Sequence, residues 1–251
     1  MATSVPIRVA AALVFAGMLA AAQPARAQDS GEGFLFRRPE GAFVVRAGFD
    51  QPFANSDIFS YVTNDFTLRK SDFRGLSLDG ELHAQLGPRT GLIFGLGWSG
   101  SKHTSEYRNF VDNDSLPIEQ TTSFERVPLT VGLRYYLTPP GAAIGHLAWV
   151  PSRFAPYVGG GIGAMWYQFR QTGDFINFSN MSVYRDVLKS SDWTLTAHVN
   201  AGVDVSLGSR TFFTTEARYT WARGPVGADF SGFHRIDLSG LALTFGVGYR
   251  M

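Results

Sequence analysis

The feature that most constrains this chain is an alternation of apolar and polar side chains in stretches of roughly ten residues. From Leu76 to Leu86 the even positions carry leucine, alanine or glycine, and the odd positions carry serine, aspartate, glutamate, histidine and glutamine. The same period of two returns in 193–207 and 241–249. Successive side chains of a β-strand point to opposite faces, so each stretch is predicted to be a strand with one apolar and one polar face.

About eight such segments follow one another, each close to the roughly 9 to 11 residues that a tilted membrane strand needs. They cover residues 41–50, 75–87, 90–101, 122–138, 155–170, 192–207, 211–222 and 237–250. An even number lets both ends of the chain lie on the same side of a membrane. The predicted fold class is therefore all-β: a transmembrane antiparallel up-and-down β-barrel of about eight strands.

The connections between these segments alternate in length. Tight turns are predicted at 87–90 and 208–210, whereas the long, polar connections are 51–74, 102–121, 171–191 and 223–236. In bacterial outer-membrane barrels the short turns face the periplasm and the long loops face the exterior. Residues 139–154 break this rule, because they should form a periplasmic turn and yet are long. No function can be assigned to them from the sequence.

Aromatic residues mark the two ends of the predicted strands. On the apolar face, the extracellular ends carry Trp98, Trp166, Trp193 and Trp221, and the opposite ends carry Tyr135, Phe213 and Tyr249. Amphipathic rings prefer the two membrane interfaces, so two belts are expected in a bilayer. Trp149 lies outside the pattern.

The polar face carries charged groups, and this separates two architectures. Its members are Arg46, Glu81, His83, Arg134, His198, Asp204, Glu216, Arg218 and Arg250. A soluble sandwich or lipocalin-type barrel would turn its apolar face inward and its polar face to water. The aromatic belts and the export signal described next favour the reverse arrangement, with charge enclosed, and the soluble fold is kept as the alternative.

The first 27 residues predict export. Arg8 precedes an apolar run in 9–22, and the segment ends with Ala25-Arg26-Ala27, an Ala-x-Ala triplet of the kind that signal peptidase accepts. The run is shorter than the roughly 20 residues of a spanning helix, so a retained anchor is disfavoured. We expect a cleaved signal peptide over 1–27, a short periplasmic segment over 28–40 and a barrel domain over 41–251.

Composition excludes several classes of function. The chain of 251 residues has no cysteine, which removes disulfides, thiolate catalysis and cysteine-ligated metals. It has 22 basic and 21 acidic residues, and loss of Arg8 and Arg26 leaves 20 basic against 21 acidic, so the processed chain is nearly neutral. Nucleic-acid binding normally needs a concentrated basic face and is not expected. No catalytic, cofactor-binding or metal-binding residue is assigned, and no cofactor is expected.

Three phrases resemble the OmpA/OmpW-like outer-membrane β-barrel superfamily. They are Val127-Pro-Leu-Thr-Val-Gly-Leu-Arg-Tyr-Tyr-Leu137, Ala155-Pro-Tyr-Val-Gly-Gly-Gly-Ile-Gly163 and the terminal stretch Gly240–Met251. The resemblance implies an outer-membrane location, contact with membrane lipid and lipopolysaccharide, and recognition of the last strand by the barrel-assembly machinery. Members typically end in an aromatic residue, whereas this chain ends Tyr249-Arg250-Met251, so recognition is expected to rest on Tyr249.

The inward charges are interpreted first as structural, because an eight-stranded barrel is barely wide enough for its own side chains. Arg46 is expected to pair with Glu81, and Glu216 with Arg218. The predicted function is a structural or surface-interaction role with a lumen closed by side chains. Aromatic loop residues would either meet an extracellular ligand or partner or pack on one another: Phe59, Tyr61, Phe66, Tyr107, Phe110, Phe175 and Phe178.

Two alternatives remain. An OmpW-like narrow channel for small hydrophobic molecules would need an interrupted strand pairing, which Pro128 could create because proline cannot donate a ladder hydrogen bond; a bulge or strand start is its more ordinary interpretation. A remote alternative is a lipid A-modifying hydrolase, since His103-Thr104-Ser105 has the His-x-Ser spacing of lipid A deacylases. Glu106 stands where that family has asparagine, so an enzyme is not expected.

Two further motifs are weak. Gly159 to Gly163 superficially resembles a phosphate loop, but no helix pattern follows, so small residues that admit large neighbours into the lumen are the better interpretation. Asp112-Asn113-Asp114 begins like a calcium loop and lacks the glycine of the sharp turn.

Overall fold

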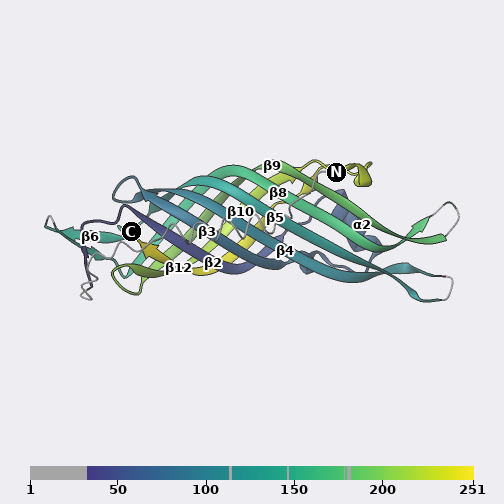
Figure 1. Ribbon diagram of the computed structural model, residues 1–251, viewed down its shortest axis with the longest axis horizontal. Coiled ribbons are helices and arrows are strands. Elements are labelled where there is room, and N and C mark those ends of the chain that lie inside the picture. Colours follow the sequence, from purple (N-terminus) through teal and green to yellow (C-terminus); the bar gives the residue numbers. More distant parts are fainter. Residues whose placement is uncertain (1–32, 113–114, 146, 178, 180–181) are drawn as a thin grey trace, which may run out of the picture.

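Eight antiparallel strands close into a ring in the computed structural model (Figure 1). The structure describes residues 33–112, 115–145, 147–177, 179 and 182–251. In order around the ring the strands are β2 (Gly41–Pro52), β3 (Gly75–Gln85), β4 (Thr90–Val111), β5 (Pro117–Tyr136), β8 (Phe154–Asn177), β9 (Ser182–Ser206), β10 (Thr211–Gly224) and β12 (Gly240–Arg250). Pairing of β12 with β2 closes the ring, which confirms the predicted barrel. The predicted signal peptide over 1–27 lies outside the described residues.

The remaining elements lie at the two ends of the barrel. They are β1 (Leu35–Phe36), α2 (Asp57–Asp65), η1 (Lys70–Phe73), β6 (Gly141–Ile144), β7 (Ala148–Pro151), η2 (Ala228–Phe230) and β11 (Ile236–Asp237). Within the described ranges, none of the helices has the length and apolar character that crossing a membrane requires.

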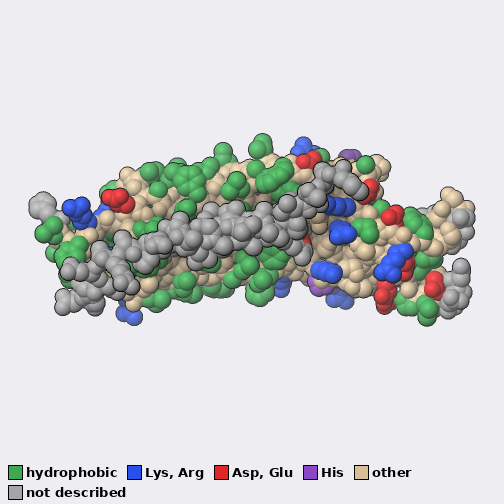
Figure 2. Space-filling model, in the orientation of Figure 1, with side chains coloured by type: hydrophobic (Ala, Val, Ile, Leu, Met, Phe, Trp, Pro, Cys, Tyr) green, Lys and Arg blue, Asp and Glu red, His purple; other side chains and the backbone are tan. Residues whose placement is uncertain are grey.

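The barrel is apolar outside and charged inside. Leu195 is 84% exposed and Val247 is 60% exposed, whereas Arg46 and Glu216 are each 1% exposed. Figure 2 shows hydrophobic side chains along both long sides of the barrel, with Lys, Arg, Asp and Glu gathered toward its ends. A soluble barrel would show the reverse distribution, because water outside favours a polar surface and an apolar core. The inside-out prediction is therefore confirmed, and the soluble alternative is excluded.

Four strands are longer than predicted. β4, β5, β8 and β9 span 22, 20, 24 and 25 residues and continue as a paired sheet beyond the rest of the ring. Register pairs such as Ser105 with Gln120 and Asp174 with Arg185 lie in stretches that the sequence analysis assigned to loops, 102–121 and 171–191, so the loop prediction is wrong for most of these stretches. Outside the bilayer neither face of a strand needs to be apolar. The strand pairing therefore continues there, although the sequence no longer alternates between apolar and polar residues.

The long connection 139–154 has a structural explanation. It folds into the hairpin of β6 and β7, and β1 adds to β7 with Leu35 opposite Trp149. Trp149 is buried, and the guanidinium carbon of Arg250 lies 5.6 Å from the centroid of a ring of Trp149. Both described chain ends lie here, since the Glu40 N–H donates to the Met251 carbonyl at 3.0 Å. This small sheet covers the end of the barrel that carries the short turns (Figure 1).

Candidate functional site

The inward charges of the predicted polar face meet in the middle of the lumen. Arg218 Nη2 lies 2.6 Å from Glu81 Oε1 and 2.7 Å from Glu216 Oε1. Arg46 contacts Glu81 as well. The Arg46–Glu81 pair joins the neighbouring strands β2 and β3. The Arg218–Glu81 pair joins β10 and β3, which are not neighbours in the ring. The expected Arg46–Glu81 and Glu216–Arg218 pairs are therefore confirmed, and they form one cluster.

Arg134 of β5 completes the cluster from the other side of the barrel. Its Nη2 lies 3.2 Å from Glu81 Oε2 and 3.2 Å from Glu216 Oε2. Its guanidinium carbon sits 3.7 Å from the centroid of the Tyr157 ring, and the Tyr157 hydroxyl donates to Glu216 at 3.0 Å. Arginine offers five donors in a rigid fork, so one side chain can bridge two carboxylates and still stack on an aromatic ring.

The remaining predicted inward residues surround this cluster. His83 Nε2 lies 2.9 Å from Glu81 Oε2, and Asp204 accepts a hydrogen bond from Tyr136 at 2.8 Å. Arg250 lies nearer the short-turn end, where its Nη2 donates to the Ser206 hydroxyl at 2.9 Å. His198 is buried in the lumen wall, and neither it nor Arg250 has an ion pair within the described part of the chain.

Charge balance explains why so many ionised groups can be buried together. Arg46, Arg134 and Arg218 face the carboxylates of Asp79, Glu81, Asp204 and Glu216, three positive charges against four negative ones. Buried ions are tolerated only when they are paired and hydrogen-bonded, because each has lost its hydration. The cluster meets the first condition, because its charges are paired, whereas several buried nitrogens of Arg46 and Arg134 have no hydrogen-bond partner within the described residues. Its side chains occupy the narrow lumen.

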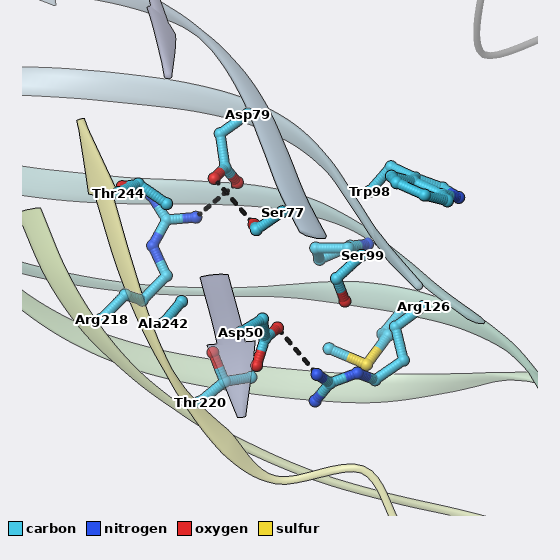
Figure 3. Close-up of a pocket in the computed structure, with 12 residues that line it drawn as sticks. Asp50, Ser77, Asp79, Trp98, Ser99, Arg126, Arg218, Thr220, Ala242 and Thr244 are labelled. Atoms are coloured by element: carbon cyan, nitrogen blue, oxygen red, sulfur yellow. Dashed lines mark hydrogen bonds and ion pairs between the residues drawn. The ribbon is translucent and has the colours of Figure 1, made fainter. Parts of the chain in front are cut away.

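A second pair lies toward the long-strand end. Arg126 Nη2 lies 2.7 Å from Asp50 Oδ2 (Figure 3). Its Nη1 donates to the Leu238 carbonyl at 2.7 Å. Between this pair and Asp79 and Arg218 remains a cavity of about 30 Å³, roughly the volume of one water molecule in the liquid. The sequence analysis missed Arg126, although it lies on the inward parity of the predicted strand 122–138.

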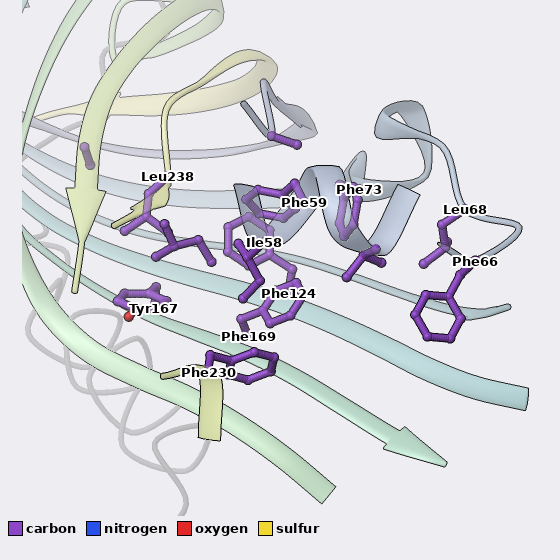
Figure 4. Packing of buried hydrophobic residues seen from close by; sticks show 14 of the residues in the cluster. Ile58, Phe59, Phe66, Leu68, Phe73, Phe124, Tyr167, Phe169, Phe230 and Leu238 are labelled. Carbon is purple, nitrogen blue, oxygen red and sulfur yellow. The ribbon is translucent and has the colours of Figure 1, made fainter. Parts of the chain in front are cut away.

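An apolar cluster fills the lumen beyond Arg126 (Figure 4). The Phe59 ring of α2 lies 5.4 Å from the Phe124 ring and 5.6 Å from the Phe169 ring, centroid to centroid, and both contacts are edge-on. The segment after β10 contributes Phe230 and Leu238. We call this cluster the lid; its buried members are Ala54, Ile58, Phe59, Val62, Phe66, Leu68, Phe73, Tyr107, Ile118, Phe124, Met165, Tyr167, Phe169, Ile176, Ala222, Phe230, Ile236 and Leu238.

The lid decides between the two interpretations of the aromatic loop residues. Phe59, Phe66, Tyr107 and Phe175 are buried, and Tyr61 and Phe110 are partly buried against the lid. Phe178 lies outside the described residues. The described rings are therefore enclosed: those of Phe59, Tyr61, Phe66, Tyr107 and Phe110 pack in or against the lid, and Phe175 packs against Tyr184.

Pro128 interrupts the pairing of β4 with β5, as the sequence suggested it could. The two strands pair in one register as far as Leu96 with Leu129 and resume at Ser99 with Arg126, without a ladder pair for Gly97 or Trp98. Pro128 occupies the register position opposite Gly97. Proline lacks the N–H that such a pair needs. Trp98 and Pro128 also line the 30 Å³ cavity.

The other motifs do not assemble into a reactive centre among the described residues. His103 is exposed, whereas Ser105 is buried and donates its hydroxyl to the Gln120 carbonyl at 3.4 Å. No group of three histidine or acidic side chains in the described ranges could hold a metal ion. Of the calcium-like triplet, 113–114 lies outside the description.

The glycines of 159–163 make room, as the sequence analysis inferred. All five lie in β8. A Cβ on Gly161 would lie 2.4 Å from the Val131 carbonyl oxygen and 2.8 Å from His198 Cε1. Any larger residue would collide with the neighbouring strand and with a lumen side chain.

Comparison with known proteins gave one family match and several similar folds. The model of the outer membrane protein beta-barrel domain matches residues 10–250. Among solved structures, Neisserial surface protein A shares 13% identity over 88% of this chain and 98% of its own, with a TM-score of 0.44. OprG from Pseudomonas aeruginosa shares 16% identity over 86% of this chain and 99% of its own, with a TM-score of 0.44. Outer membrane protein W of E. coli shares 16% identity over 86% of this chain and 100% of its own, with a TM-score of 0.35. No curated protein matches this chain.

Proposed function

The chain belongs to the outer membrane protein beta-barrel domain family, and from that premise we propose that it is a closed barrel with a structural and surface-interaction role. The observation that carries the proposal is the double obstruction of the lumen. The ion-pair cluster around Arg134 blocks the middle, and the lid around Phe59 blocks the long-strand end. A structural barrel needs no path for solutes, whereas a channel would need one through both layers.

Free energy also favours a permanent closure. Opening the middle would separate Glu81 and Glu216 from three arginines, and each unpaired buried charge costs several kcal/mol, roughly 3 to 5 in measured cases. Opening the lid would expose phenylalanine rings to water, each at a cost of about 2 to 3 kcal/mol. Thermal motion does not supply both of these free energies at once, so we expect no steady ionic conductance.

The interaction role is assigned to the projecting sheet of β4, β5, β8 and β9. Its outer part carries exposed apolar side chains, including Tyr184 and Val187 on β9 and Val111 on β4. Most aromatic residues of the predicted loops are buried in or against the lid. The projecting sheet is therefore the surface that remains for an external partner.

Planar-bilayer recordings test the closed lumen. The native barrel should give no stable conductance, and a variant without α2 and η1 should still be closed by the ion-pair cluster. Combining that deletion with Glu81→Gln and Glu216→Gln should produce openings. Large and steady conductance of the native protein would contradict the proposal.

A narrow sideways conduit for small hydrophobic molecules is the second candidate. It is favoured by one observation: the missing ladder pairs at Gly97 and Trp98 lie beside a cavity that Trp98 and Pro128 line. Uptake of a hydrophobic fluorophore by cells with and without the protein would test it. If the conduit operates, Pro128→Val should lower uptake because valine can donate the missing hydrogen bond. Equal uptake in deletion and native strains would dismiss the conduit.

A further inference from the structure

The register of the four long strands places three basic residues in one row on the outside of the barrel. Lys102 of β4 pairs with Ser123 of β5, Ser123 with Arg170 of β8, and Arg170 with Lys189 of β9. Residues directly opposite in neighbouring strands have Cβ atoms about 4.5 to 5.5 Å apart. Lys102, Arg170 and Lys189 are all exposed, so their charged ends lie on one continuous outer face.

This basic row runs beside a row of tryptophans. Trp166 of β8 pairs with Trp193 of β9, and Trp98 of β4 occupies the matching level. Each basic residue lies four positions further toward the long-strand end than the tryptophan of its own strand, about 13 Å along the strand. Tryptophan marks the membrane interface, so the basic row lies at the level of the lipid headgroups.

The three cations have no protein counter-ion within the described residues. None of the described ion pairs or side-chain hydrogen bonds includes the charged end of Lys102, Arg170 or Lys189. Arg170 and Lys189 are directly opposite each other, an arrangement that destabilises a sheet unless an anion is present. Two acidic residues lie nearby: Glu125 of β5, two positions closer to the tryptophans, is buried, and the Asp229 carboxylate accepts a hydrogen bond from the backbone N–H of Lys189 at 2.9 Å.

Four positions further out on the same two strands there is a contrast. Asp174 of β8 is the register partner of Arg185 of β9, so opposite charges face each other there. The basic row therefore stands apart from the ordinary mixture of charges on the projecting sheet. Figure 2 shows Lys and Arg side chains gathered where the apolar band of the barrel gives way to the projecting part.

We propose that Lys102, Arg170 and Lys189 form a binding site for the phosphate groups of a phosphorylated lipid in the membrane leaflet at the long-strand end. The occupant is a lipid because the same face continues into apolar surface: Trp193 and Leu195 of β9 are exposed next to the row. Acyl chains can cover that surface while the phosphates meet the cations, whose long stems can bend toward the headgroups. The site does not depend on whether the lumen conducts.

Native mass spectrometry of the detergent-solubilised barrel tests the site. Lipid A carrying two phosphates is titrated against the native protein and against the triple variant K102Q/R170Q/K189Q. Each basic residue near an anionic lipid surface contributes about fivefold in affinity, so the triple variant should bind roughly 100-fold more weakly. The matched control R89Q/R153Q/R185Q loses the same charge at exposed positions outside the row and should bind within about twofold of the native protein.

Two further arms identify the source of the phosphate. Lipid A stripped of both phosphates should bind equally weakly to the native protein and the triple variant. Inorganic phosphate at the same phosphate concentration should fail to displace bound lipid A. The site would be refuted by equal losses in the test and control variants, or by displacement with inorganic phosphate. A gel-mobility shift between heated and unheated samples verifies that every variant is folded.

Discussion

Arg218 and Glu81 are 137 positions apart in the chain, and the Nη2 of Arg218 lies 2.6 Å from the Oε1 of Glu81. The two residues belong to β10 and β3, which are separated in the ring by β12 and β2. Closure of the barrel brings them together, so this ion pair can form only when the whole ring of strands is assembled.

Glu81→Gln should strongly destabilise the barrel. It removes the carboxylate that Arg46, Arg134 and Arg218 share, and buried cations left without a partner cost roughly 3 to 5 kcal/mol. The free energy of unfolding in urea, measured in lipid vesicles, would show the loss. Glu119→Gln, at an exposed position on the projecting part of β5, is the control and should change stability by less than about 0.5 kcal/mol. Equal effects of the two substitutions would contradict a cooperative buried cluster.

Tyr157→Phe separates two roles of one side chain. It keeps the ring against Arg134 and removes the hydroxyl that donates to Glu216. Loss of one hydrogen bond to a charged group should cost about 1.5 to 3 kcal/mol. Tyr157→Ala should cost about 3 to 5 kcal/mol because it also removes the buried ring. The same unfolding measurement applies, and a phenylalanine variant as unstable as the alanine variant would show that the ring contributes little.

Phe59→Ala should loosen the lid and leave the barrel strands intact. The Phe59 ring contacts Phe73, Phe124 and Phe169, so its removal leaves a cavity at the centre of the lid. We expect amide hydrogen exchange in α2 to accelerate by at least tenfold, while exchange in β3 and β12 stays unchanged. Phe154→Ala, at an exposed ring, serves as the control. Uniform acceleration throughout the barrel would indicate that the lid and the ring unfold together.

Acid should release the contact between α2 and the segment after β10. The Asp57 carboxylate accepts hydrogen bonds from the His234 backbone N–H at 2.9 Å and from the His234 ring at 2.8 Å, and the backbone bond is the main cause that lowers the pKa of Asp57 below its ordinary value of 3.8. A lowered pKa in the folded state means that the contact stabilises the fold above the unfolded pKa and is lost as pH falls through the folded pKa.

Hydrogen exchange at the His234 amide as a function of pH checks this. After correction for the intrinsic pH dependence of exchange, protection should be constant near neutral pH and fall once the pH drops below the pKa of Asp57. Asp57→Asn should remove that step, because an amide does not titrate in this range. A step of the same size in the asparagine variant would assign the effect to another group.

Some of this structure could be predicted from local patterns. The alternation in 76–86 gave both the strand and its inward face, because a period of two leaves no other regular backbone. The positions of Arg46, Glu81 and Arg134 inside the lumen followed from parity alone. The projecting parts of β4 and β9 could not be predicted in this way, since strands that are polar on both faces show no alternation.

The lid was outside the reach of the sequence for a different reason. Phe59 and Phe230 come from segments separated by most of the barrel, and a run of aromatic residues in a loop fits an exposed surface as well as a buried one. The same holds for Trp149, which breaks the belt pattern and is buried by the β6–β7 hairpin.

By itself the sequence determined that this chain forms a membrane barrel with charge inside, since side-chain parity is a local property of a strand. Only the tertiary structure decided which charges meet, because the register and the closure of the ring set the distance between Arg218 and Glu81. It also decided that the loops fold inward over the lumen. The packing of the loops depends on the space between segments that are far apart in the chain, and no local sequence pattern determines that space.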